Sequence, residues 1–163
     1  MMQTLIPSKN WVQNSYSAGN KFNLALSDHN IAGQIARLLN ANNKLTTSHN
    51  ASSILNSPIR YFIELYGQTV LGCIGLSHES RMDKIVHISV ARNARKMGIA
   101  KHLLELTINS SQMDVIYMHI REDNAKSKSL VTKMGFNIIA YIPKFNYNIL
   151  TFCLFRRNNV GRN

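Results

Sequence analysis

A strand that runs into a tight turn and then an amphipathic helix is the feature that most restricts the fold of this chain. The apolar pattern predicts the strand at residues 83–90 and the helix at residues 98–109. The apolar positions of that helix are Ile99, Leu103, Leu104, Leu106 and Ile108. A further strand at residues 115–120 and a helix at residues 124–134, which Gly135 ends, follow directly. The centre of the chain is therefore a strand–helix–strand–helix unit.

Two predicted hairpins flank this unit. Their strands are residues 61–66, 69–76, 136–142 and 149–155. Gly67 and Gln68 form the turn of the first hairpin, and residues 143–148 form the loop of the second. Residues 77–82 read as a loop between the first hairpin and the central unit. Hairpins on both sides of a strand–helix–strand unit predict an α+β fold with mixed strand directions.

The N-terminal part predicts a strand at residues 22–26 and then a helix that Asp28 caps. The apolar face of this helix consists of Ile31, Ile35, Leu38 and Leu39. Residues 51–55 predict a short second helix. A length of 163 residues suits one domain with one core. We expect three sections along the chain: an arm at residues 1–21, a single domain at residues 22–157 and a basic tail at residues 158–163.

The chain carries a strong excess of positive charge. Its 19 Lys and Arg residues against 8 Asp and Glu residues give a net charge of +11. Such a balance favours an acidic partner. The candidates are a polyanionic cofactor, a nucleic acid or the ribosome, and an acidic protein, while general solubility is the simplest alternative.

The cysteines and the apolar segments bear on the compartment. Cys73 and Cys153 each lie in an apolar run, which predicts buried free thiols rather than a disulfide or a metal site. No stretch is long and apolar enough to span a membrane, and residues 1–11 lack the apolar core of a signal peptide. We therefore expect a cytoplasmic protein without metal or membrane contact, either a monomer or a homodimer.

The turn before the central helix has the features of a phosphate site. Gly98 and Ala100 are small, so the backbone can come close to a ligand there. The first N–H groups of a helix have no partner within it, and the helix dipole favours an anion at that end. Arg95, Lys96 and Lys101 add positive charge. An ordinary strand-to-helix turn with solvated basic residues is the alternative.

Two segments carry a resemblance to a known family. Arg95-x-x-Gly98-x-Ala100 resembles the Q/R-x-x-G-x-G/A signature of the GNAT superfamily of N-acetyltransferases. The second segment resembles that family's N-x-x-A-x-x-L-Y-x-K-x-G-F run, at Asn124, Ser127, Leu130, Lys133, Gly135 and Phe136. The resemblance implies a three-layer α+β fold, a central mixed and mostly antiparallel sheet with helices on both faces. It also implies direct transfer of an acetyl group from acetyl-CoA to a primary amine of a protein N-terminus, a lysine or a small molecule.

The resemblance further implies a binding role for each matching residue. Backbone N–H groups at residues 96–101 would hold the pyrophosphate of coenzyme A. The strand at residues 88–90 would bulge, part from its parallel neighbour at residues 115–120 and pair with the pantetheine arm. Lys128 is a further candidate for a phosphate contact. The expected coenzyme-binding residues are Ile88, Ser89, Val90, Arg95, Lys96, Met97, Gly98, Ile99, Ala100, Lys101, Asn124, Ser127 and Lys133.

Direct transfer needs a base for the amine and a backbone donor for the thioester oxygen. The base candidates are His119 on the second strand of the central unit, His87 on the first strand, and Glu79 in the loop before it. For either histidine, an ordinary position in the sheet is the alternative. The expected donor is the peptide N–H of Ser89 or Val90.

The general acid departs from the family pattern. Val131 stands where the family often has a tyrosine that protonates the leaving thiolate. Tyr141 or Tyr147 from the C-terminal hairpin would replace it, or a thiolate with a pKa of about 8.5 would leave unaided. Val131 also favours an alternative on the same fold, a non-catalytic module that contacts nucleic acid through its basic surface. A phage-type transferase that modifies DNA or RNA is a further alternative, which no particular residue set indicates.

Overall fold

The computed structural model describes residues 29–42 and 47–156. Four expectations lie outside the described residues: the arm at 1–21, the strand at 22–26, the Asp28 cap and the tail at 158–163. In chain order, the described elements are α1 (His29–Asn42), α2 (Ala51–Leu55), β1 (Arg60–Tyr66), β2 (Thr69–Glu79), β3 (Met82–Val90), the 3₁₀ helix η2 (Arg92–Ala94), α3 (Ile99–Ser110), β4 (Val115–Arg121), α4 (Ala125–Lys133), β5 (Asn137–Pro143) and β6 (Asn148–Phe155). No helix in this part of the chain combines the length and the apolar character that a membrane crossing needs.

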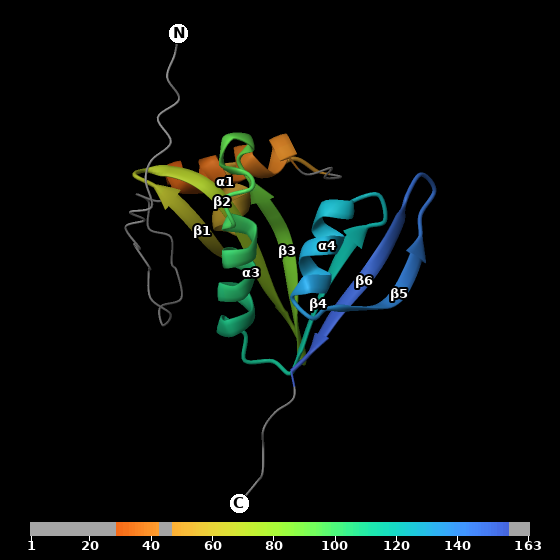
Figure 1. The fold of residues 1–163 in the computed structure, drawn as a ribbon. Helices are drawn as coiled ribbons and strands as arrows, with labels where there is room; N and C mark the ends of the chain where they lie inside the picture. Colours follow the sequence, from red (N-terminus) through yellow and green to blue (C-terminus); the bar gives the residue numbers. More distant parts are fainter. Residues whose placement is uncertain (1–28, 43–46, 157–163) are drawn as a thin grey trace, which may run out of the picture.

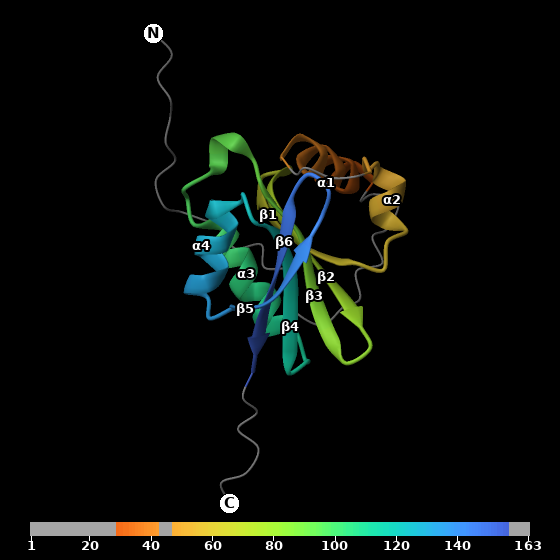
Figure 2. The ribbon, with the colours of Figure 1, turned by 90° about the vertical axis from the view of Figure 1, so that its right-hand side faces the viewer.

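The strands form one mixed sheet in the order β1-β2-β3-β4-β6-β5. Every neighbouring pair of strands is antiparallel except β3 and β4, which run parallel. Figure 2 shows α3 and α4 on one side of the sheet and α1 and α2 on the other. The predicted α+β fold, with a mixed and mostly antiparallel sheet between helices, is confirmed.

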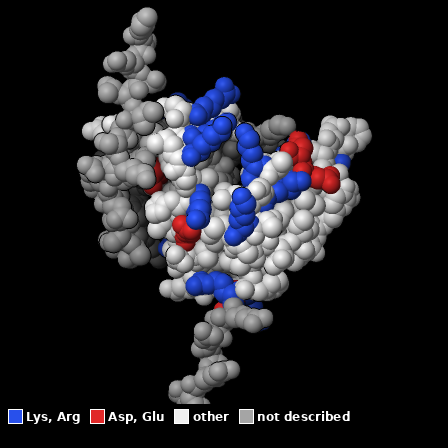
Figure 3. Space-filling view, viewed as in Figure 1, with Lys and Arg blue, Asp and Glu red and all other residues white. Residues whose placement is uncertain are grey.

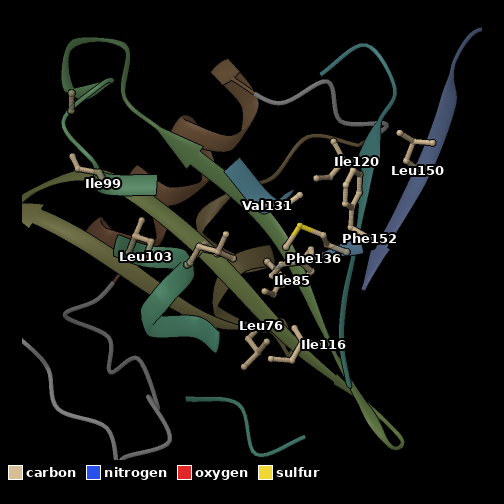
Figure 4. Packing of buried hydrophobic residues seen from close by; sticks show 14 residues of the cluster. Leu76, Ile85, Ile99, Leu103, Ile116, Ile120, Val131, Phe136, Leu150 and Phe152 are labelled. Atoms are coloured by element: carbon tan, nitrogen blue, oxygen red, sulfur yellow. The ribbon is translucent and has the colours of Figure 1, made fainter. Parts of the chain in front are cut away.

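Each face of the sheet has its own core. Under α3 and α4, Leu103, Val131 and Phe136 pack against strand residues such as Phe152 (Figure 4). Under α1 and α2, the core contains Ala32, Ile35, Ala36, Leu39, Ile54, Val70 and Cys73. Cys73 and Cys153 are both buried and free, as predicted.

One predicted core position of α3 is wrong. Leu106 is 41% exposed, whereas Thr107 is completely buried. The Thr107 hydroxyl donates a hydrogen bond to the Leu103 carbonyl (2.7 Å), so its polar atom is satisfied inside the helix. The buried stripe of α3 therefore runs through Ile99, Leu103, Leu104 and Thr107.

The loop predicted at residues 77–82 is also wrong, because β2 and β3 continue through most of it. Ser77 pairs with Lys84, His78 with Asp83, and Glu79 with Met82. His78 Nδ1 lies 2.9 Å from Asp83 Oδ1 across the two strands. Polar residues that read as a loop thus form a polar end of the sheet through cross-strand pairs.

Gly72 in β2 lets α3 lie close to the sheet. A Cβ at this position would stand 2.7 Å from Ile99 Cγ2 and 3.1 Å from Leu103 Cδ1. The contact is closer than packed carbon atoms allow, so the first turn of α3 rests on the backbone of β2. The glycine therefore helps to place the N-terminus of α3.

We expect Gly72→Ala to lower the free energy of unfolding by about 1–3 kcal/mol, because it overpacks this contact. Gly33→Ala in α1 is the matched control, since its Cβ would meet Arg37 Nη1 at 3.6 Å and Ala51 Cβ at 3.9 Å. The control should be stabilised by up to about 1 kcal/mol through helix propensity. Urea unfolding measures both variants, and equal stabilities would contradict the proposed packing.

Candidate functional site

β3 and β4 pair over a short stretch and then part. The parallel ladder contains only the pairs Asp83–Ile116, Lys84–Tyr117 and Ile85–Met118. Beyond them the two strands diverge, which Figure 1 shows as a V that opens toward the ends of both strands. An open strand edge of this kind offers backbone N–H and C=O groups to an extended ligand.

A bulge in β3 accompanies this divergence. Cys73 pairs with Ser89 and Gly75 with Val86, so His87 and Ile88 together stand opposite one residue of β2. The backbone of His87 has φ +58°, in the left-handed region. An extra residue on one strand bends that strand and disrupts its ladder.

The ladder between β2 and β3 decides which backbone groups face the open edge. The Ala91 N–H donates to the Leu71 carbonyl at 2.8 Å. In an antiparallel ladder such hydrogen-bonded pairs alternate with pairs that point outward. Ser89 therefore directs its N–H toward β2, whereas Val90, opposite Gly72, directs its N–H away from β2. Of the two expected oxyanion donors, this geometry favours Val90.

The turn after β3 presents an open helix N-terminus. Lys96 (φ +65°) and Gly98 (φ +83°) both adopt left-handed backbone conformations, and α3 starts at Ile99. The first bond within the helix runs from the His102 N–H to the Gly98 carbonyl at 3.0 Å. The three preceding N–H groups, of residues 99–101, thus have no intrahelical acceptor, and glycine offers no side chain to cap them. This end of α3 suits a phosphate group.

Basic side chains gather on the same face of the molecule. Figure 3 shows Lys and Arg side chains spread around a hollow on the face that carries α3 and α4. The exposed or half-buried basic residues of the turn and the two helices are Arg92, Arg95, Lys96, Lys101, Lys126, Lys128 and Lys133. This charge favours a ligand with several phosphates.

Arg95 has a structural task within this group. Its Nη2 donates to Asn42 Oδ1 at 2.8 Å, and its Nε donates to the Val90 carbonyl at 3.3 Å. Asn42 Nδ2 lies 3.2 Å from Ser89 Oγ and 3.4 Å from the Val90 carbonyl oxygen. Arg95 and Asn42 therefore tie the turn and the end of β3 to the C-terminus of α1.

The residues of the second motif lie on α4. Asn124 Oδ1 accepts the Ser127 N–H at 3.1 Å, so it caps the helix and leaves only its Nδ2 group to donate to a ligand. Lys133 lies at the opposite end of α4, about 13 Å along a helix axis of nine residues. Figure 1 shows the start of α4 at the same end of the sheet as the turn before α3, whereas Lys133 is the last residue of α4.

The sheet brings two of the predicted catalytic residues together. The Tyr117 hydroxyl donates to Glu79 Oε2, and the Tyr117 ring meets the His119 ring edge-on with centroids 5.5 Å apart. Lys84 Nζ lies 3.6 Å from Glu79 Oε1, and His119 Nδ1 lies 3.1 Å from Thr151 Oγ1. His119 directly follows Met118, the last residue of β4 that pairs with β3. It therefore stands where the two strands begin to part.

Sequence reasoning missed Tyr117 and Thr151. The signal that identifies Tyr117 is the period of two along β4, which puts Tyr117 and His119 on the same face of the sheet. Thr151 becomes a neighbour only through the pairing of β4 with β6, where it lies opposite His119. That pairing joins residues 32 positions apart in the sequence, so no local sequence pattern predicts the contact between His119 and Thr151.

The electrostatics of this cluster suit proton acceptance at neutral pH. Burial, followed by the charge of Lys84, lowers the pKa of His119 below its ordinary 6.5. The hydrogen bond from Tyr117 lowers the pKa of Glu79, while burial raises the pKa of Tyr117 to about 12. The imidazole is thus neutral, the carboxyl group ionised and the phenol protonated.

The structure does not bring His87 or Ser89 into this cluster. His87 Nδ1 lies 2.7 Å from the Tyr61 hydroxyl, and its ring meets that of His49 at 4.9 Å. Burial lowers the pKa of His87 to about 4. The Ser89 hydroxyl is buried and donates to the Leu38 carbonyl at 3.2 Å. Neither side chain reaches Glu79 or His119 through these contacts.

The two candidate general acids, Tyr141 and Tyr147, lie in different places relative to His119. Tyr141 pairs with Leu150 and so lies on the α4 face, whereas His119 pairs with Thr151 on the other face. The Tyr147 ring lies under the Arg121 guanidinium at 4.2 Å, and Arg121 shares its face with His119. Val131 is completely buried in the core. Of the two tyrosines, Tyr147 is the one beside the His119 face.

Comparisons with known proteins agree with this geometry. A model of the acetyltransferase (GNAT) family matches residues 23–136 of the chain. GCN5-related N-acetyltransferase 6, chloroplastic, from Arabidopsis thaliana is 29% identical over 97 residues, which are 52% of this chain and 33% of that protein. The chain thus spans about a third of the length of this curated relative.

Solved structures show the same fold. The structure of yncA from Salmonella typhimurium with its cofactor acetyl-CoA has a TM-score of 0.69 at 15% identity, over 83% of this chain and 92% of that chain. The ribosomal-protein-S18-alanine N-acetyltransferase from Escherichia coli has a TM-score of 0.64 at 14% identity, over 85% of this chain and 96% of that chain. At these identities the likeness concerns the fold.

Proposed function

Because this chain belongs to the acetyltransferase (GNAT) family, we propose that it transfers an acetyl group from acetyl-CoA directly to a primary amine. The observation that carries the proposal is the open edge of β3, which leads into the uncapped N-terminus of α3. An extended arm can pair with the first, and a diphosphate can bind at the second. Coenzyme A contains both groups in this order, because its pantetheine arm is joined directly to the diphosphate.

The proposed binding roles follow the geometry. The N–H groups of residues 99–101 bind the pyrophosphate, and Lys96 and Lys101 add positive charge beside it. The outward backbone groups of Ile88 pair with an amide of the pantetheine arm, which leaves the Val90 N–H for the thioester oxygen. Asn124 contributes its Nδ2 group from the start of α4. Arg95 supports the turn from behind through Asn42 rather than binding phosphate itself.

The proposed chemistry begins with loss of a proton from the acceptor amine, whose pKa is roughly 8 for an α-amine and about 10.4 for a lysine. His119 accepts this proton, and Thr151 holds its Nδ1 edge. Glu79, bound by Tyr117, adds negative charge that favours the resulting imidazolium. The Val90 N–H donates to the thioester oxygen as it gains charge.

The departing thiolate needs little help from an acid. Its pKa of about 8.5 makes it a good leaving group near neutral pH. Val131 offers no proton from α4, and the Tyr147 hydroxyl on the opposite side of the sheet is the remaining candidate donor. The acceptor proposed here is a protein N-terminus, a lysine or a small-molecule amine, and the predicted nucleic-acid or acidic-protein partner stays a prediction.

Calorimetry with acetyl-CoA and an acetylation assay test the proposal. We expect binding in the micromolar range, and release of free coenzyme A thiol when peptides with free N-termini, lysine peptides or small amines are added. The thiol is measured with a chromogenic disulfide. Absence of coenzyme binding would overturn the proposal, and binding without thiol release on any amine would favour a non-catalytic module on the same fold.

A further inference from the structure

The bulge in β3 puts a non-glycine residue into an unfavourable backbone conformation. His87 has φ +58°, a region that residues other than glycine seldom occupy. Such a conformation persists only where surrounding contacts hold it. The contacts of His87 therefore show what keeps β3 in its bulged form.

Three elements contact His87 on the face that α1 and α2 cover. The Tyr61 hydroxyl of β1 lies 2.7 Å from His87 Nδ1, and the two rings stack at 6.0 Å with an angle of 13°. His49, just before α2, meets the His87 ring edge-on at 4.9 Å. Cys73 of β2 donates its thiol to the His87 carbonyl at 3.8 Å.

The segment that carries His49 is itself anchored. The His49 N–H donates to Asn40 Oδ1 at 2.9 Å, and Asn40 Nδ2 donates to the His49 carbonyl at 2.8 Å. Asn40 belongs to α1, so the His49 ring has a firm support. Of the ring contacts described above, the one with Tyr61 is a hydrogen bond to the imidazole. Because a hydrogen bond depends on direction, Tyr61 fixes the orientation of the His87 ring.

The bulge decides which groups of β3 face the gap. It begins at His87, two residues after Ile85, the last residue that pairs with β4. Without the extra residue, the positions after it would shift by one, and each side chain and N–H group would turn to the other side. Ile88 and Val90, which pack against the core under α3, would exchange places with Ser89. The Val90 N–H would then point at β2 instead of the gap.

We propose that Tyr61 is a positioning residue, whose hydroxyl group holds His87 and thereby keeps the β3 bulge that aims the Val90 N–H at the thioester arm of the coenzyme. This inference rests on the proposed function. Burial lowers the pKa of His87 to about 4 and raises the pKa of Tyr61, so both groups are neutral throughout the working pH range. The hydrogen bond between them is accordingly constant over that range.

The first experiment removes only the hydroxyl. Tyr61→Phe should raise the dissociation constant of acetyl-CoA roughly fivefold, the typical net effect of one neutral hydrogen bond. KM for acetyl-CoA should rise with it, while KM for the amine should stay unchanged. Tyr66→Phe, on the same strand but 61% exposed, is the matched control and should leave both constants at the wild-type values. Equal acetyl-CoA affinity in Tyr61→Phe and wild type would overturn the proposal.

The second experiment tests the backbone. Glycine favours a positive φ, whereas a β-branched residue resists it. His87→Val should therefore bind acetyl-CoA about tenfold more weakly than His87→Gly, although both lack the imidazole. Adding Tyr61→Phe to His87→Gly should cause no further loss, because the hydroxyl has no partner left to hold. Equal affinity of the valine and glycine variants would contradict a role of the bulge.

These outcomes separate the two proposals. If wild-type protein binds no acetyl-CoA in calorimetry, the proposed function fails and the positioning role fails with it. If wild type binds and Tyr61→Phe binds equally well, only the positioning role fails. Thermal unfolding of each variant shows whether the protein is folded at the temperature of the binding assay. If Tyr61→Phe binds acetyl-CoA as tightly as wild type once both are assayed below their unfolding temperatures, this result counts against the role of Tyr61.

Discussion

Gly98→Val is expected to weaken acetyl-CoA binding by at least about a hundredfold, because a branched side chain would stand where the backbone must approach the diphosphate. Gly98 has φ +83° and opens α3, and a Cβ added there meets nothing within 4 Å of the protein. A Cβ at this position therefore meets no other part of the described chain. The change acts on the ligand and on the left-handed backbone, and calorimetry with acetyl-CoA measures its effect on binding.

Gly67→Val is the matched control for this prediction. Gly67 has φ +58° in the turn between β1 and β2, and a Cβ there also meets nothing within 4 Å. Both variants should therefore lose a similar free energy of unfolding, at least about 1–2 kcal/mol for a left-handed residue other than glycine. Only Gly98→Val should lose the coenzyme. Full coenzyme affinity in Gly98→Val would rule out the α3 N-terminus as the diphosphate site.

His119→Gln is expected to lower kcat by roughly a hundredfold to a thousandfold, the usual contribution of a positioned general base. Glutamine keeps a similar length and polarity but cannot accept the proton of the amine. The dissociation constant of acetyl-CoA should change little, because His119 lies on the face of the sheet opposite α3 and α4. Thiol release under saturating acetyl-CoA measures kcat. His29→Gln, at the exposed start of α1, is the control and should retain wild-type kcat.

The dependence of kcat on pH provides a second test of His119 as the base. Burial and Lys84 lower the pKa of His119 below 6.5, so its neutral, proton-accepting form dominates at neutral pH. Wild-type kcat should therefore be full above the ordinary histidine pKa and decline only as the pH falls through the lowered value. His119→Gln should lack this decline. If the variant keeps both the wild-type rate and the decline, His119 is not the base, and Glu79→Gln becomes the decisive variant.

Much of the fold could be read from local patterns. The helical period at residues 99–110 and the alternation in the hairpins depend on neighbouring residues, so the order of elements in the described part was predictable. The incorrect prediction of a loop at residues 77–82 shows where local patterns are insufficient. Ser77, His78 and Glu79 are polar, yet each is held in a strand by a partner on β3. Their structure follows from pairing rather than from their own propensities.

The candidate site likewise has parts that the sequence could predict and parts that it could not. The turn proposed as the coenzyme site consists of Gly98 and the start of a helix, which are close together along the chain, so the sequence alone could predict it. The roles of the two histidines could not be separated from the sequence, because both lie on strands of the central unit. The bulge turns His87 toward Tyr61 and His49, while the pairing of β4 with β6 places His119 beside Thr151.

By itself, the sequence determined the order of helices and strands, the position of the turn before α3 and the family, since each of these is written in residues close together along the chain. Only the tertiary structure decided which side chains meet. Glu79 of β2 meets Tyr117 of β4 because β3 lies between these strands and pairs with both, antiparallel with β2 and parallel with β4. One extra residue in β3 then sets the direction of the Val90 N–H, because side chains and backbone groups alternate along a strand and a shift of one position reverses them.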